Sequence, residues 1–195
     1  MRPYHVAAFA LAVIANLTWT TPTVAQEVRI NGAGASFPFP LYSAWFRHYN
    51  RITSGVRINY QSVGSGAGVR NLINRTVDFS ASDAAMTDAE IAEVQDGVVI
   101  LPMTAGQAAL ASADLSSDDL RIWVTDPSDP AAYPIATFTW MLFFRSHGND
   151  RVAEALRDFV TWAMADGQGM AEELGYIPLP EILVKRVLAQ VPDIQ

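Results

Sequence analysis

The stretch Asn31-Gly-Ala-Gly-Ala-Ser-Phe-Pro-Phe-Pro40 decides how this chain of 195 residues is interpreted. Its glycines, alanines and serine have small side chains, so the main-chain groups stay accessible. Pro40 suits the first turn of a helix, because its missing N–H would be unpaired there in any case. A bare loop that opens a helix gathers unpaired N–H groups at the positive end of the helix dipole, so it favours an anion. The alternative is a turn of small residues that lets a strand pack closely on a helix.

Alternation of strands and helices extends this pattern along the chain. Strands are predicted at residues 27–30, 56–61, 76–80, 98–102 and 133–144. Helices are predicted at residues 41–52, from 69 onward, after the capping box 87–90, at 149–165, ahead of a C-terminal glycine at 175, and at 180–191. This succession predicts an α/β fold with a mainly parallel sheet covered by helices.

Three loops carry the candidate site. The stretch with Ser36, the second bare loop 62–68 with Ser65, and the segment ending in Asp83 each follow a predicted strand. Ligands of such sheets bind beyond the carboxyl ends of the strands, so these loops are expected at one edge. Two serine hydroxyls beside runs of N–H groups predict an anion site, the second loop resembling a nest of amides. Two tight turns with incidental serines are the alternative.

Asp83 sets a condition on the anion, because a carboxylate repels negative charge. It fits only if the anion carries a proton that the carboxylate can accept in a hydrogen bond, which selects hydrogen phosphate over sulfate. The alternative is that Asp83 caps a turn or a helix. Arg70, one turn into the second helix, either assists the anion or is an ordinary exposed helix residue.

The composition excludes several classes of site. The chain has no cysteine, so disulfides and thiolate metal sites are impossible. It has 13 basic and 20 acidic residues, a formal net charge of −7 and a pI near 4.8, which argues against nucleic acid and anionic membranes as partners. Lys185 is the one lysine, so anion contacts fall to arginine or to the backbone.

Enzyme motifs are lacking, so no catalytic residue, metal or cofactor is expected. The sequence has no P-loop and no complete dinucleotide-binding fingerprint, and residues 34–38 lack the last glycine of a nucleophile elbow. His48 and His147 are predicted to be solvated surface residues. Trp45, Trp140 and Trp162 are predicted to belong to the core.

Residues 1–25 have the pattern of a secretory signal peptide. Arg2 supplies the positive start, residues 6–17 are apolar, and Ala25 is a small residue suited to cleavage. The apolar run is too short to span a membrane. We therefore expect export and a mature chain, 26–195, that is periplasmic or secreted.

Taken together, these stretches resemble the substrate-binding proteins of phosphate ABC transporters, the PstS family. The resemblance is carried by residues 32–38, 60–68, 77–83, 101–106, 133–135, 139–140 and 173–180. It implies one lobe of a type II periplasmic-binding-protein fold. It also implies that phosphate is bound by Ser36, Phe37 through its N–H, Ser65 and Asp83, with the backbone of Ala35 and Gly66 as further candidates. An ABC permease in the membrane is the implied partner.

The sequence departs from the family in one large respect. The family has two lobes that close on phosphate, and neither the arginine nor the Asp-Gly-Ser-Gly-Thr type loop of the second lobe is present here. Residues 26–106 resemble the first part of lobe I, and residues 107–195 resemble the segment that returns to it. The expected function is therefore phosphate binding for ABC-type uptake by half of a site, with weak affinity. The alternatives are a non-binding module that pairs through its exposed cleft face, for instance with a separate second lobe, and a phosphate-ester hydrolase.

Overall fold

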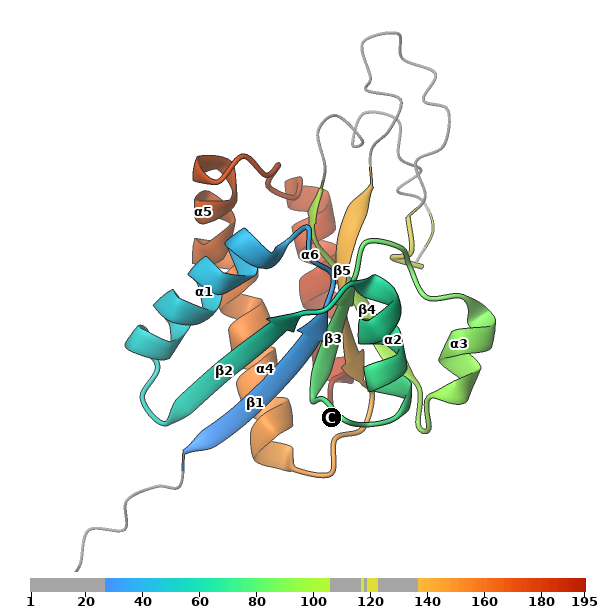
Figure 1. Cartoon of the computed structure of the whole chain (residues 1–195). Helices are drawn as coiled ribbons and strands as arrows, with labels where there is room; N and C mark the ends of the chain where they lie inside the picture. The colour runs from blue at the N-terminus through green and yellow to red at the C-terminus, as the bar shows by residue number, and fades with distance from the viewer. Residues whose placement is uncertain (1–26, 106–116, 118, 123–136) are drawn as a thin grey trace, which may run out of the picture.

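One mixed sheet forms the centre of the computed structural model, which describes residues 27–105, 117, 119–122 and 137–195 (Figure 1). The strands are β1 (Val28–Gly34), β2 (Val56–Ser62), β3 (Phe79–Ser82), β4 (Val98–Ala105) and β5 (Phe138–Phe144), in the spatial order β2-β1-β3-β5-β4. β1 is parallel to β2 and β3, whereas β5 is antiparallel to both β3 and β4. Four strands therefore share one direction, which confirms the mainly parallel sheet.

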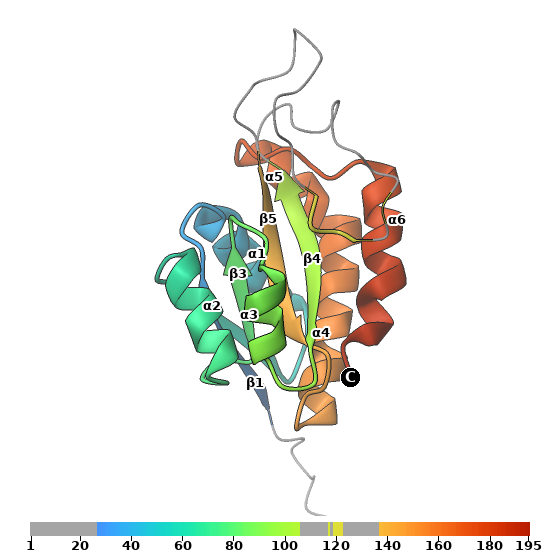
Figure 2. The same ribbon diagram turned by 90° about the vertical axis from the view of Figure 1, so that its right-hand side faces the viewer.

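Helices cover both faces of the sheet (Figure 2). They are α1 (Phe39–Ile52), α2 (Ser65–Ile73), α3 (Asp88–Glu93), α4 (Asp150–Trp162), α5 (Gln168–Glu173) and α6 (Glu181–Gln190), with a π turn at Ala163–Gly167 between α4 and α5. α1 and α4 share one face, where Phe46 and Phe159 meet with ring centroids 5.1 Å apart. α2 covers the other face, with α3 beside it.

The apolar patterns account for these elements. β5 is buried at all seven positions, as expected for an interior strand with a continuous apolar run. The helix predicted at 41–52 is α1, which buries Trp45 and Tyr42 completely. The capping box is confirmed, since Thr87 accepts a hydrogen bond from the Glu90 N–H and Glu90 binds the Thr87 N–H in return. Residues 133–136 of the predicted strand and the signal segment 1–25 lie outside the described residues.

Two expectations about the glycine-rich stretches need correction. β1 runs on to Gly34, because a side chain at Gly32 or Gly34 would collide with β3: a Cβ would lie 2.2 Å from the Phe79 ring and 2.1 Å from the Ala81 carbonyl oxygen, respectively. These two glycines therefore serve the packing of β1 on β3, which neither expectation named, and the loop proper starts at Ala35. In the second stretch α2 already begins at Ser65, so its amides form a helical first turn and not a nest.

The burial of the tryptophans and histidines agrees only in part with the prediction. Trp45 and Trp140 are wholly buried, and Trp162 is half-buried with the His48 ring stacked on it at 5.5 Å. His147 is also half-buried rather than solvated, and its Nε2 has no hydrogen-bond partner within the described chain. Burial lowers its pKa, Asp78 opposes this, and Arg75 and Arg157 add smaller lowering effects. None of the helices in the described ranges is both long and apolar enough to cross a bilayer.

Candidate functional site

The three predicted loops meet at the carboxyl ends of β1, β2 and β3. The second loop is fixed to the first, because the N–H groups of Val63 and Gly64 both donate to the Gly34 carbonyl, at 3.0 and 2.9 Å. The first is fixed to the third strand by the Ala35 N–H, which donates to the Ala81 carbonyl at 2.9 Å. Parallel strands with direct bonds between their loops therefore bring the predicted residues into one place.

The first loop presents its N–H groups while its carbonyls are occupied. Tyr60 donates its hydroxyl to the Ala35 carbonyl at 2.8 Å, and Tyr176 donates to the Phe37 carbonyl at 2.6 Å. Within the described residues, the N–H groups of Ser36 and Phe37 have no acceptor. Ser36 is exposed, and the Phe37 ring packs edge-on against Tyr176. The loop therefore offers donors and no free carbonyl at these two positions.

The second loop leads into the first turn of α2. This helix has nine residues and no side-chain cap, so the N–H groups of Ser65, Gly66 and Ala67 are unpaired among the described contacts. Gly68 lets the helix approach the end of β1, because a Cβ on it would lie 2.5 Å from the Gly34 Cα. Two sets of main-chain donors are thereby held side by side at the positive end of a helix dipole.

Asp83 provides the acceptor of the site. Its Oδ1 accepts from Thr139 Oγ1 at 2.9 Å, its Oδ2 lies 3.4 Å from Ser65 Oγ, and its own N–H donates to Ser65 Oγ at 3.1 Å. Burial raises the pKa of this half-buried carboxyl, and the hydrogen bonds from Thr139 and Ser65 oppose that rise. No basic group contributes to the shift, so the described chain leaves the carboxylate without a direct counter-charge.

Sequence reasoning missed the groups that support these loops. Thr139 reaches Asp83 because β5 pairs antiparallel with β3. Local sequence patterns do not predict which strands pair. Tyr42 is wholly buried below the loops, and its hydroxyl has no partner in the described part of the chain. Burial, Tyr60 and Asp83 all raise its pKa. A layer of tyrosines therefore lies under the acceptor and holds the first loop.

Arg70 lies at the rim of the site. Its guanidinium folds back over the first turn of α2, with Nη1 3.5 Å from the place that a Cβ on Gly66 would take. This direction follows the tilt of helical side chains toward the N-terminus. No ion pair or side-chain hydrogen bond involves Arg70 within the described ranges, so its charge remains available beside the unpaired amides.

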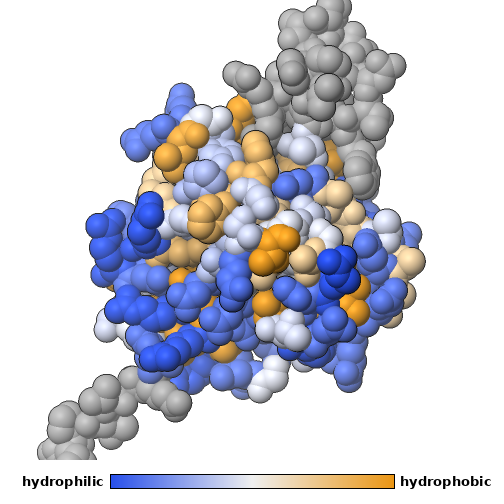
Figure 3. All heavy atoms as spheres, in the orientation of Figure 1, coloured by the Kyte–Doolittle hydropathy of each residue, from blue (hydrophilic) through white to orange (hydrophobic). Residues whose placement is uncertain are grey.

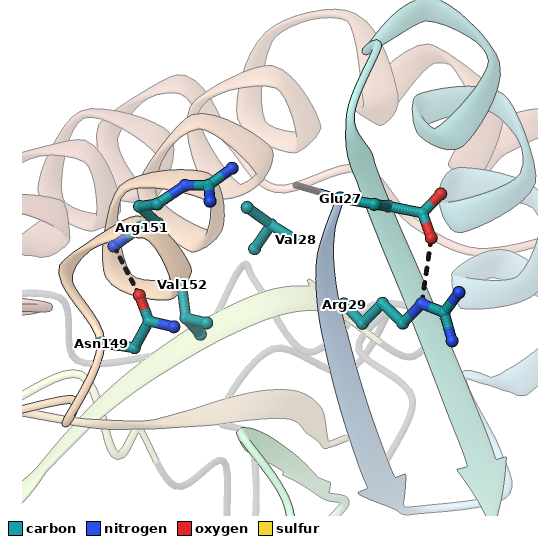
Figure 4. A pocket seen from close by; sticks show the side chains of 6 residues that line it. All are labelled: Glu27, Val28, Arg29, Asn149, Arg151 and Val152. Atoms are coloured by element: carbon teal, nitrogen blue, oxygen red, sulfur yellow. Dashed lines mark hydrogen bonds and ion pairs between the residues drawn. The ribbon is translucent and has the colours of Figure 1, made fainter. Parts of the chain in front are cut away.

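A separate hollow of about 610 Å³ lies at the opposite, amino end of β1 (Figure 4). Its polar groups are engaged locally: Glu27 pairs with Arg29 at 3.0 Å, and Asn149 caps α4 by accepting from the Arg151 N–H at 3.0 Å. It contains none of the predicted site residues. The described residues also bring together no group of three His, Asp or Glu side chains suited to a metal.

Comparison with known proteins identifies the relatives of the chain. Residues 20–97 match the family described as a PBP superfamily domain. The phosphate-binding protein PstS of Pasteurella multocida is 39% identical over 134 residues, which cover 61% of this chain and 38% of that protein. The PstS of Haemophilus influenzae is 51% identical over 70 residues, 36% of this chain and 21% of that protein. The chain is thus similar in sequence to part of the PstS phosphate-binding proteins. It spans well under half the length of these two PstS relatives.

Solved structures show the same fold. A possible phosphate binding protein from Planctomyces limnophilus aligns with a TM-score of 0.67 at 11% identity, over 87% of this chain and 99% of that one. A phosphate-binding protein from Stenotrophomonas maltophilia aligns with a TM-score of 0.62 at 13% identity, over 84% and 94%. The mixed α/β sheet flanked by helices is therefore the architecture found in phosphate-binding proteins.

Proposed function

We propose that the carboxyl edge of β1, β2 and β3 binds hydrogen phosphate as part of extracytoplasmic, ABC-type phosphate uptake. The observation that carries this is the convergence of unpaired main-chain donors on one acceptor. The donors are the N–H groups of Ser36, Phe37, Ser65 and Gly66, with the Ser36 hydroxyl, and the acceptor is Asp83. Ala35 positions the loop but offers no free donor, because its N–H already donates to the Ala81 carbonyl. The names of the PstS relatives support phosphate as the ligand.

The acceptor explains the choice of anion. Hydrogen phosphate carries one proton, which it donates to the Asp83 carboxylate while its other oxygens accept from the amides. Sulfate has no proton at neutral pH, so its oxygen would face the carboxylate oxygen without a hydrogen bond between them. Thr139 and Ser65 fix the direction of the carboxylate.

The affinity is expected to be low. In our proposal residues 26–106 and 107–195 form lobe I alone, and the second lobe with its arginine is absent. Losing three charge-assisted bonds of about 1.5 kcal/mol each removes about 4–5 kcal/mol, or about three decades of affinity. The half-site then binds phosphate at about millimolar concentration and has no second lobe to close over the anion.

Calorimetry tests this with the whole chain. Phosphate is expected to give saturable heat at neutral pH, sulfate much less, and a Ser65→Ala variant a weaker response to phosphate. Equal heats for phosphate and sulfate, or none for either, contradict a selective site. Export through the segment 1–25 and docking to an ABC permease belong to the same proposal, and co-purification with permease subunits tests the docking.

A second function is favoured by one observation, the exposed apolar residues around the loops. Phe37, Phe39, Val63 and Leu174 are 51%, 42%, 45% and 44% exposed. Apolar residues are visible among polar ones across the middle of this face (Figure 3). Such a rim suits pairing with another chain, for instance a separate second lobe. Light scattering over a concentration range tests pairing between copies of this chain, which a monomer at all concentrations contradicts.

A further inference from the structure

A groove of about 420 Å³ lies beside the C-terminal half of α1. It is lined by Ala44, Arg47, Asn50, Arg51, Arg57 and Met170. Three basic and no acidic side chains line it, although the whole chain has 13 basic against 20 acidic residues. Strongly hydrophilic residues gather on the α1 and β2 side of the molecule (Figure 3). The groove is therefore locally positive, although the chain as a whole carries a negative charge.

The two arginines of α1 stand one turn apart and are unpaired. Arg47 and Arg51 are exposed, and in the described parts of the chain neither guanidinium makes an ion pair or a hydrogen bond. Like charges at this spacing slightly destabilise a helix. The helix dipole compensates for Arg51, which lies in the last turn, but not for Arg47. The local structure therefore gives no reason for a cation at Arg47.

The third arginine is held in place. Arg57 Nη1 donates to the Asn50 carbonyl at 2.8 Å, and its Nε pairs with Glu27 at 3.1 Å. The Asn50 side chain bonds both backbone groups of Ile58, at 2.8 and 3.0 Å, and so ties the end of α1 to the edge strand β2. A guanidinium has five N–H donors, so Arg57 keeps donors beyond these contacts. The part of the groove wall formed by Asn50 and Arg57 is thus fixed before any partner arrives.

We propose that this groove docks a short acidic segment of a partner protein. The planar guanidinium matches a carboxylate with two parallel hydrogen bonds. Met170 and Ala44 provide an apolar surface for a neighbouring side chain, and methionine adapts well to such contacts. A nucleic acid or an anionic bilayer would extend beyond the groove and meet the negative charge of the rest of the chain. A segment of a few residues can stay within the groove.

The test uses a fluorescein-labelled peptide of alternating glutamate and leucine, with fluorescence anisotropy on the whole chain at low salt. The double variant Arg47→Gln/Arg51→Gln is expected to bind about tenfold more weakly. Lys185→Gln is the control, since it removes an exposed helical cation that belongs neither to the groove nor to the loop site and should leave peptide binding unchanged. A peptide with glutamine in place of glutamate should not bind. Circular dichroism checks that the variants are folded.

Three results would overturn the proposal. These are no binding of the acidic peptide at low salt, equal affinity in the double variant and the unaltered chain, and tighter binding of double-stranded DNA or of vesicles of anionic lipid than of the peptide. Phosphate binding by the double variant is expected to be unchanged, because the groove takes no part in the loop site.

Discussion

The carboxyl edge of the sheet and the groove beside α1 are suited to anions by opposite means. At the edge the donors are main-chain N–H groups, fixed by contacts between strands, and Arg70 is the cation at the rim. In the groove the donors are the guanidinium groups of exposed arginines, and the main-chain N–H groups of Arg47 and Arg51 lie within the helix α1. The first region depends on the whole fold and the second on a few side chains.

This difference sets how each region responds to substitution. Main-chain donors cannot be removed one by one, so the edge is sensitive to any residue that separates its strands. Arginines can be replaced without moving the backbone, so the groove should lose function with little loss of stability. The following predictions separate the two regions.

The largest effect is expected at Gly34. Its Cβ would lie 2.1 Å from the Ala81 carbonyl oxygen, which belongs to backbone and cannot turn away. Gly34→Ala should therefore force β1 and β3 apart and lower the free energy of unfolding by about 3 kcal/mol. Urea denaturation followed by circular dichroism measures this. Gly148→Ala is the matched control, because a Cβ there meets nothing within 4 Å. Similar stabilities for the two variants would contradict the close contact.

The second effect concerns which anion the edge prefers. Asp83→Asn keeps an acceptor for Thr139 but removes the negative charge that opposes sulfate. The preference for phosphate over sulfate should fall about tenfold, mainly through better binding of sulfate, since a hydrogen bond to a charged group contributes about 1.5 kcal/mol or more. Calorimetry with both anions measures the ratio. A ratio that stays constant would mean that Asp83 does not face the anion.

Local patterns in the sequence predicted the parts of the fold that local chemistry controls. The apolar spacing located α1, and the capping box located α3, because both depend on residues within one or two turns. The end of β1 was predicted too early, since Gly34 continues the strand for reasons that lie on β3. Gly32 shows the same limit, because its close neighbour is Phe79, 47 positions away.

The candidate site shows a similar division. Ser36, Ser65 and Asp83 were found because parallel strands place their following loops together, a rule that needs only the order of elements. Thr139 and Tyr176 were missed, since they reach the loops from β5 and from the segment after α5. The resemblance to PstS proteins pointed to the stretches that contain them but assigned them no role.

The third effect distinguishes the two arginine environments. Arg70→Ala should weaken phosphate binding about three- to fivefold, because an exposed charge near the anion contributes a fraction of 1 kcal/mol to about 1 kcal/mol. Arg47→Ala removes the same charge from the groove and should leave phosphate binding unchanged. Raising the salt concentration should reduce the difference between the variants. Equal losses in both would indicate only a general effect of net charge.

The smallest effect is a pH dependence of stability. Because burial raises the pKa of Asp83 above its unfolded value of about 4, the folded chain binds more protons between the ordinary and the raised pKa. Stability contributed by this group is therefore present below the unfolded pKa and is lost as the pH rises through the folded pKa. The loss should be small, since the carboxyl is only half-buried and solvent screens its charge.

Comparison with Asp83→Asn isolates this contribution, because the other carboxylates titrate alike in both chains and cancel in the difference. Urea midpoints measured without phosphate, from below pH 4 to neutral pH, should show the asparagine variant gaining stability relative to the unaltered chain and then levelling off. Arg47→Ala, far from Asp83, should show no such trend. If the difference between the asparagine variant and the unaltered chain does not change with pH, then Asp83 titrates normally. The charged Asp83 carboxylate at the sheet edge would then not lower the stability of the fold. In this respect it would resemble the solvated arginines of the groove.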